Sequence, residues 1–200
     1  MFESFLAKFK ITARISDELD KGIFAGVPND LFELFRLMGG ATFAHGIYRI
    51  HTPRSSLKWS IQLAEYFPVY KNQIFPFAFD WLARQYCIDR DNQQVFLFDP
   101  ATVEDFKLKK DLLAFHDEDV SGDLFAADFF NDICSFQSIK SLEYSNCLGH
   151  KIPLFLNAKD EVENYAKQDI EVYWHFQTQL YNQVKNLPEG TKIGNIKLER

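Results

Sequence analysis

The sequence predicts an α+β protein with a single domain, in which a central and mostly antiparallel sheet is flanked by helices. Three observations lead to this fold class. The chain has 200 residues, a length that fits one domain with a sizeable core. Apolar residues follow a helical period in some segments and alternate in others. Neither an internal repeat nor a low-complexity linker divides the sequence, so we expect one domain over residues 1–200.

The first part of the chain predicts two helices and a short strand. The apolar residues that indicate a first amphipathic helix are Phe2, Phe5, Leu6 and Phe9. A second helix, with Asn29 or Asp30 as its cap, ends at Gly39-Gly40. Its expected buried residues are Leu31, Phe32, Leu34, Phe35, Leu37 and Met38. Residues 46–51 then alternate like a strand.

A third helix is expected to start at Thr52-Pro53, because Thr is a good cap and Pro fits the first helical position. The helix reaches Tyr66, and Pro68 stops it. The residues expected to face the core are Leu57, Ile61, Leu63 and Ala64. Trp59 is expected at the edge of this buried side.

Residues 74–100 predict the spine of the sheet. Two apolar runs, Phe75–Tyr86 and Val95–Phe98, are separated by the polar stretch Asp89–Gln94, which contains turn-forming residues. The runs are interpreted as hairpin-connected strands with one face toward the core and the other toward a more polar surface. Asp80 and Arg84 are charged residues inside an apolar run, so we expect them to form a structural pair.

The remaining elements alternate between short strands and helices. A strand is expected over 103–108, a short helix over 112–120, and a helix over 124–136 with an apolar stripe. That stripe comprises Leu124, Phe125, Phe129, Ile133 and Phe136. Residues 151–156 contain a proline and predict a loop or an edge strand. Asp169 caps a last helix that reaches about Val184, and the tail 192–198 is a candidate terminal strand.

Composition restricts the class of partner. The net charge is −6 and the isoelectric point is near 5.4, which disfavours nucleic acids and anionic membranes and favours a basic protein. Cys87, Cys134 and Cys147 form neither a disulfide framework nor a zinc motif, so reduced thiols in the cytoplasm are expected. No run of eighteen apolar residues occurs, and the first ten residues lack the features of a signal peptide.

A search for catalytic or metal-binding motifs yields no candidate. His116-Asp117 invites comparison with metal phosphohydrolases, but the further ligands of such a site are not present in a matching pattern. Asp89–Asn92 fails as a calcium loop because Gln94 and Pro100 occupy positions that need Gly and Glu. We therefore predict no enzyme activity, no cofactor and no metal. An enzyme with an unrecognised site remains an alternative, for which a deep polar pocket would be the evidence.

Two acidic clusters stand out after residue 116. The first comprises Asp117, Glu118, Asp119, Asp123, Asp128 and Asp132, and the second comprises Glu161, Glu163, Asp169 and Glu171. Each is either an ordinary solvated face or a patch that meets a basic partner, since complementary charge steers association. The sequence alone leaves both interpretations open.

Several phrases resemble one family. Residues 39–51 (GGATFAHGIYRIH), Trp59 and residues 79–86 (FDWLARQY) are similar to the GAD-like segment of bacterial type VI secretion immunity proteins. Residues 148–156 (LGHKIPLFL), 162–164 and 169–174 (DIEVYW) are similar to the companion C-terminal domain of these DNase-immunity proteins. The residues that carry this signature are Tyr48, Arg49, His51, Trp59, Asp80, Trp81, Arg84, Pro153 and Trp174. Ala83 stands where the family usually has Gly, and Asn157-Ala158 replaces a Gly-Gly turn.

The resemblance implies a GAD-like part over about residues 1–110 and an immunity part over about 111–186, with a SUKH-like style of fold and action. It implies a cytoplasmic protein that neutralises a cognate toxin, a secreted DNase, without catalysis. Carboxylates suit this role because a nuclease presents a basic groove for DNA. The expected toxin-binding residues are Asp117, Glu118, Asp119, Asp123 and Asp128. The alternative is an interaction or regulatory module of the same fold outside toxin immunity, and the oligomeric state is left open.

Overall fold

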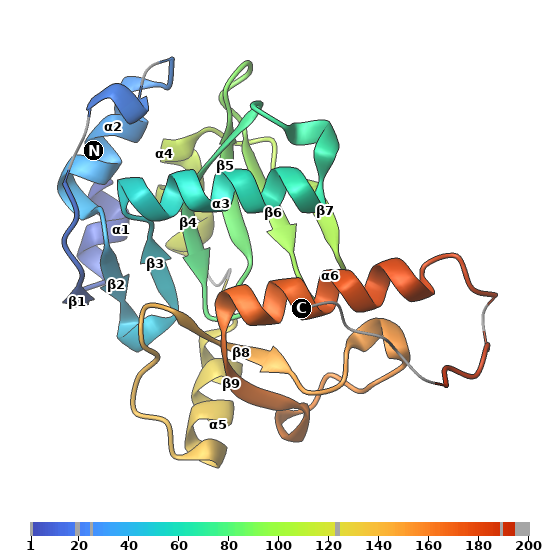
Figure 1. Cartoon of the computed structure of the whole chain (residues 1–200). Coiled ribbons are helices and arrows are strands. Elements are labelled where there is room, and N and C mark those ends of the chain that lie inside the picture. Colours follow the sequence, from blue (N-terminus) through green and yellow to red (C-terminus); the bar gives the residue numbers. More distant parts are fainter. Residues whose placement is uncertain (1, 19–20, 25, 123–124, 189, 195–200) are drawn as a thin grey trace.

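A seven-stranded antiparallel sheet runs through the middle of the molecule, with its strands side by side in chain order (Figure 1). We describe it from a computed structural model that covers residues 2–18, 21–24, 26–122, 125–188 and 190–194. The strands of this sheet are β1 (Ile11–Arg14), β2 (Ala41–Phe43), β3 (Tyr48–Ile50), β4 (Ile74–Asp80), β5 (Gln85–Asp89), β6 (Val95–Asp99) and β7 (Glu104–Lys107). A smaller antiparallel sheet consists of β8 (Asn146–His150) and β9 (Tyr165–Asp169). The α+β class and the antiparallel sheet expected from the sequence are confirmed.

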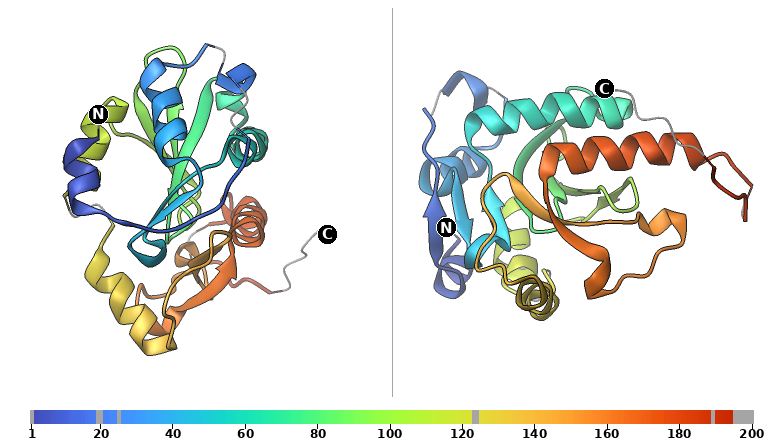
Figure 2. Two further views of the ribbon diagram at one scale, coloured as in Figure 1. Left: turned by 90° about the vertical axis from the view of Figure 1, so that its left-hand side faces the viewer. Right: turned by 60° about the horizontal axis from the view of Figure 1, so that its bottom comes forward.

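Helices lie on both sides of the large sheet, so the molecule has three layers (Figure 2). The helices α3 (Pro53–Tyr66) and α6 (Ile170–Val184) run side by side on one face. The opposite side carries α1 (Glu3–Lys8), α2 (Asn29–Met38), α4 (Leu112–Ala114) and α5 (Ala127–Gln137). A π-helical turn, Phe115–Val120, continues α4. Short 3-10 turns occupy Lys21–Phe24, Ala44–Gly46, Pro68–Tyr70, Leu154–Leu156 and Val162–Asn164.

The central strands are buried on both faces. Every residue of β4 and of β5 is buried, because α3 and α6 cover one face of these strands while the α1, α2 and α4 layer covers the other. The expectation of one polar face was therefore wrong. Alternate side chains of these strands point into two different cores, one on each face of the sheet, and not into a core and the solvent.

The two cores draw on residues from the whole chain. On the side of α4, the ring centroids of Tyr86 and Phe115 lie 5.1 Å apart and those of Tyr48 and Phe125 lie 5.0 Å apart. Phe115 and Phe125 belong to the part of the chain that follows residue 110, whereas Tyr48 and Tyr86 precede it. The same core thus contains residues from before and after residue 110, as expected of one domain.

The buried side of α3 differs from the expected one. Ser56, Trp59 and Leu63 face the sheet and are buried, whereas Leu57 is 42% exposed and Ile61 is 65% exposed. The side of the helix that carries Trp59 faces the sheet because Trp174 of α6 packs against this ring, with their centroids 6.0 Å apart. The start of α3 is as predicted: the Thr52 side chain accepts a hydrogen bond from the Ser55 N–H, and the Ser55 hydroxyl accepts one from the Thr52 N–H.

Several local expectations need correction. The N-terminal residue flanking α2 is Pro28, and no side chain caps this helix, so the predicted Asn29 or Asp30 cap is wrong. Strands β1, β2, β8 and β9 were not predicted, because each is short and is specified by its partner strand more than by its own pattern. Phe136 was expected in the core but is 59% exposed. Leu124 and residues 195–198 of the predicted terminal strand lie outside the described residues, and residues 192–194 form no strand.

Asp80 and Arg84 form the structural pair expected from the sequence. The Arg84 Nε donates to Asp80 Oδ2 over 2.6 Å, and the Asp80 side chain is fully buried. The same carboxylate accepts hydrogen bonds from the Leu82 N–H, the Arg84 N–H and the Tyr86 hydroxyl, each at 3.0 Å. Although burial opposes it, the charge of Asp80 raises the pKa of Arg84. The pair fixes the turn between β4 and β5.

The remaining signature residues also belong to the framework. Arg49 is fully buried and donates to the carbonyl oxygens of Asp80, Glu143, Tyr144 and Asn146, which ties β3 to the segment that leads into β8. His51 is held between Ser55 Oγ and Gln85 Oε1, each at 2.9 Å. The indole N–H of Trp81 donates to the Phe125 carbonyl over 2.7 Å. Pro153 is buried and introduces the turn Leu154–Leu156.

Two departures from the family pattern fall on left-handed backbone. Ala83 has φ +65° and Asn157 has φ +64°, a region that glycine occupies without strain. The Ala83 carbonyl accepts a 2.7 Å hydrogen bond from the Trp174 indole, which holds the turn against α6. Asn tolerates this region better than most residues, so Asn157 serves the turn that a glycine would make.

Candidate functional site

Three of the five acids proposed for toxin binding are engaged within the molecule. The Asp117 carboxylate accepts a hydrogen bond from the Phe5 N–H at 3.3 Å. Glu118 and Asp119 both pair with Lys110, the former at 3.1 Å. Asp123 lies outside the described residues. The structure therefore leaves Asp128 as the member of this set whose carboxylate is exposed and has no described partner.

The second acidic cluster is largely engaged as well. Glu171 pairs with Lys58 across the α3 and α6 interface, and Glu161 lies 3.3 Å from Lys159. The Asp169 side chain accepts from the first N–H groups of α6, at 2.9 and 3.1 Å, as predicted for its cap. These acids serve the fold, which leaves little of this cluster free for a partner.

The outer face of α5 combines free carboxylates with an exposed ring. Asp128 and Asp132 lie one turn apart, both are exposed, and neither has a cationic partner among the described residues. Phe136 follows one turn later on the same face and is 59% exposed. The opposite side of the helix is anchored by Phe130 and Ile133 in the core. We call the surface formed by Asp128, Asp132 and Phe136 the α5 face.

A groove of about 500 Å³ borders the α5 face. Its walls are the turn Ala44–Gly46 and the flank of α5, with Asn131 and Ser135 next to the exposed face and Lys140 at the far rim. The wall is rigid: the His45 carbonyl accepts from the Leu142 N–H at 2.9 Å. Gly46 has φ +111°, and a Cβ there would lie 2.6 Å from the Leu142 side chain, so this close approach requires glycine.

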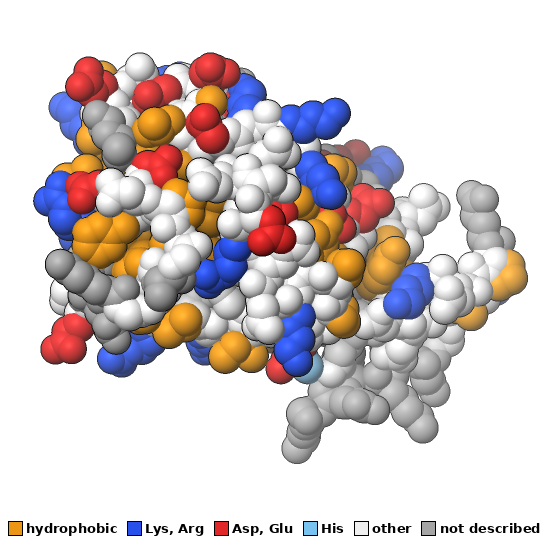
Figure 3. Space-filling model, turned by 90° about the horizontal axis from the view of Figure 1, so that it is seen from above, with side chains coloured by type: hydrophobic (Ala, Val, Ile, Leu, Met, Phe, Trp, Pro, Cys, Tyr) orange, Lys and Arg blue, Asp and Glu red, His pale blue; other side chains and the backbone are white. Residues whose placement is uncertain are grey.

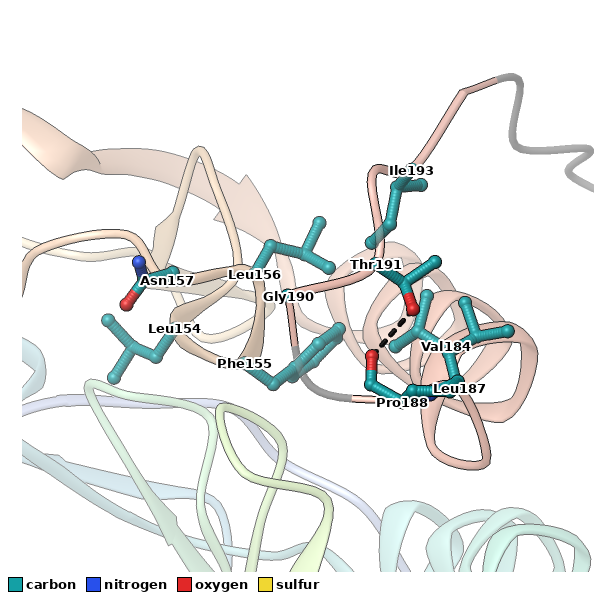
Figure 4. Close-up of a pocket in the computed structure, with 10 residues that line it drawn as sticks. All are labelled: Leu154, Phe155, Leu156, Asn157, Val184, Leu187, Pro188, Gly190, Thr191 and Ile193. Carbon is teal, nitrogen blue, oxygen red and sulfur yellow. Dashed lines mark hydrogen bonds between the residues drawn. The ribbon is translucent and has the colours of Figure 1, made fainter.

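Larger hollows lie elsewhere on the described part of the molecule. One, of about 550 Å³, separates the turn at residues 154–157 from the end of α6 and the segment after it (Figure 4). Phe155 and Leu156 lie on one side of it and Val184 and Leu187 on the other, and none of the described residues that line it is titratable. Another, of about 750 Å³, runs along α3. The hollow at the end of α6 brings together no acid, base or thiol among its described lining residues, whereas the hollow along α3 is lined by Glu65, Lys71 and Arg90.

Three histidines, His51, His116 and His150, are buried and hydrogen-bonded. His45 and His175 are exposed. His116 Nδ1 donates to the Leu112 carbonyl at 2.7 Å, so its Nε2 accepts from the Tyr48 hydroxyl at 3.0 Å. Burial lowers the pKa of His116 to about 4 and that of His51 to about 3, and it lowers the pKa of His150 as well. The rings are therefore neutral at physiological pH and are committed to internal hydrogen bonds.

The cysteines and acids assemble no reactive centre within the described ranges. Burial raises the pKa of Cys87, Cys134 and Cys147, which keeps these thiols protonated. No group of three or more His, Cys, Asp or Glu side chains in the described part of the chain converges on a point that could hold a metal ion. None of the helices in that part combines the length and hydropathy needed to cross a bilayer.

Comparison with known proteins identifies the fold and no more. No family model matches the sequence, and no curated protein matches it. The structure is similar to the crystal structure of Atu4351 from Agrobacterium tumefaciens, with a TM-score of 0.65 and 16% identity. The match covers 90% of this chain and 89% of that chain. The two chains thus share their overall fold over most of their length.

Only part of the α5 face was predicted from the sequence. Asp128 and Asp132 were noted as acidic, but Phe136 was assigned to the core. The signal that could have found the face is the spacing of Asp128, Asp132 and Phe136 at i, i+4 and i+8, which places all three on one side of a helix. The engagement of Glu118 and Asp119 by Lys110 depends on tertiary structure and has no signal in the local sequence.

Proposed function

We propose that this protein binds and neutralises a cognate bacterial toxin, a secreted DNase with a basic surface, in the cytoplasm and without catalysis. The observation that carries the proposal is the α5 face. Asp128 lies in the first turn of α5, where a carboxylate stabilises the helix, whereas Asp132 one turn later repels it by roughly 0.2–0.5 kcal/mol, so helix stability does not account for Asp132. A basic partner would relieve this repulsion and cover Phe136 at the same time.

The rest of the molecule supports this role. The net charge of −6 favours association with a basic protein. Most other acids discussed above are paired or act as caps, so the free carboxylates on α5 are available to a partner. The sequence resemblance to immunity proteins of type VI secretion also favours toxin binding. The groove beside α5 would admit a side chain or loop of the toxin next to the charged contact.

Charge reversal on α5 tests the proposal. The variant D128K/D132K should weaken binding to the toxin encoded next to this gene by at least about tenfold, equal to about 1.4 kcal/mol. It should also reduce the salt dependence of binding and the protection of cells that express the toxin. Isothermal titration and growth measurements provide the readouts. F136A should weaken binding without changing the salt dependence.

A matched control uses two exposed acids outside the α5 face. E18K/E104K changes the net charge by the same amount and should bind and protect like the wild type. If D128K/D132K binds as tightly as this control, the α5 face is not the contact. If the wild-type protein neither binds the neighbouring toxin nor protects against it, toxin neutralisation itself is wrong.

A further inference from the structure

Helix α3 carries two apolar stripes, and the chain covers one of them. Trp59 and Leu63 face the sheet, whereas Leu57, Ile61 and Ala64 lie on the other side at i, i+4 and i+7. Ile61 is 65% exposed and Leu57 is 42% exposed. One buried stripe is sufficient to dock a surface helix. A second stripe at regular helical spacing therefore indicates an additional contact surface.

This outer stripe forms one wall of the groove of about 750 Å³. Ile74 at the start of β4 lines the groove with a side chain that is itself buried, and the rim carries Glu65 on α3 with Lys71 and Arg90 beside the strands. The groove lies on the side of α3 that faces away from α6, which is the side seen in Figure 3. Hydrophobic side chains are interspersed with basic and acidic ones on that face.

The rim charges decide which partner fits. Glu65 and Lys71 are exposed, and neither forms an ion pair among the described residues. Arg90 adds a second positive charge next to Lys71, so a basic toxin would be repelled here. A second copy of this chain matches the surface, because a two-fold axis brings Glu65 of each copy to Lys71 of the other copy while the apolar stripes pack together.

We propose that the α3 groove, formed by Leu57, Ile61, Ala64, Ile74, Glu65, Lys71 and Arg90, is a self-association surface that pairs two copies of this chain about a two-fold axis. The α3 helices then cross at Ile61. Helix α5 lies away from α3, toward the other side of the large sheet (Figure 2), so its exposed residues stay open in the pair. Each pair therefore has two free α5 faces, and self-association is independent of toxin binding.

Sedimentation of the full-length protein over a wide concentration range tests the pairing. The wild type should form a reversible dimer, and I61D should raise its dissociation constant by at least about tenfold. V172D is the matched control, because Val172 lies on α6 with the same 65% exposure and outside the groove. A wild type that stays monomeric, or an I61D variant that dimerises normally, would overturn the proposal.

Charge exchange tests the two-fold arrangement. E65K alone and K71E alone should each dissociate, because like charges then face each other at both symmetry-related contacts. A mixture of the two variants should associate as a heterodimer. In that heterodimer the new lysine of E65K meets the new glutamate of K71E, and the second contact keeps the native Glu65 opposite the native Lys71. Failure of the mixture to associate refutes the pairing of charges. Loss of toxin binding in monomeric I61D would overturn the independence of self-association from toxin binding.

Discussion

Acidification should destabilise this protein well above the pH at which its carboxylates titrate. His51 and His116 are fully buried and neutral, and burial holds their pKa values at about 3 and about 4. In the unfolded chain the pKa of His is about 6.5, so the unfolded state binds more protons as the pH falls below that value. Stability is therefore present above about pH 6.5 and is lost as the pH falls toward the folded pKa values.

The size of this loss follows from the same values. Between about pH 7.5 and about pH 5.5, each histidine removes about 1.4 kcal/mol, so the pair removes about 3 kcal/mol from the free energy of unfolding. The lowered pKa of His150 acts in the same direction. Urea unfolding at a series of pH values measures the effect directly.

A variant separates the contribution of one histidine. H116Q keeps an acceptor for the Tyr48 hydroxyl, and it should lower stability at neutral pH while removing about half of the dependence on pH. A free energy of unfolding that stays constant between about pH 7.5 and about pH 5.5 would refute the argument. An H116Q variant with the full wild-type slope would show that His116 does not change its protonation on unfolding.

Two further predictions concern buried polar groups. Gln177 is fully buried, and neither its amide nitrogen nor its amide oxygen has a hydrogen-bond partner among the described residues, so Q177M should raise the free energy of unfolding by about 1 to 2 kcal/mol, measured by urea denaturation. A loss of stability in Q177M would mean that its amide is satisfied in solution. D80N should lower stability by about 3 kcal/mol, because it weakens the ion pair with Arg84 in a buried setting, and thermal unfolding should show the loss. A D80N variant as stable as the wild type would show that hydrogen bonding alone fixes the turn.

Local sequence determined the ends of elements better than their orientation. The start of α3 at Thr52 and the cap of α6 at Asp169 were predicted correctly from the neighbouring residues, whereas the Asn29 or Asp30 cap expected for α2 was wrong. The buried side of α3 was wrong, because the helix has two apolar stripes and Trp174 of a distant helix selects one. Periodicity indicates that a stripe exists, and tertiary contacts decide whether the chain itself covers it.

The candidate site was predictable to a similar extent. The acidic composition and the position of Asp128 are evident from the sequence. That Glu118 and Asp119 are occupied by Lys110 is not evident, because the pairing depends on how the segment after β7 returns to the π-helical turn. The exposure of Phe136 likewise depends on where α5 ends its contact with the core. A charged residue in a sequence is thus a candidate for partner binding until the structure shows which groups surround it.

The buried guanidinium of Arg49 makes folding of the first half of the chain depend on residues near position 145. Its carbonyl partners at Glu143 and Asn146 follow it by 94 and 97 residues, so β3 acquires its full set of hydrogen bonds after most of the polypeptide has left the ribosome. Until then the guanidinium has no place in the interior, and Tyr48 and Tyr86 lack the rings that later cover them. A fragment that ends near residue 110 would contain the Arg49 guanidinium without these carbonyl partners, and its aromatic surface would be uncovered. Such a fragment is a target for chaperones and proteases.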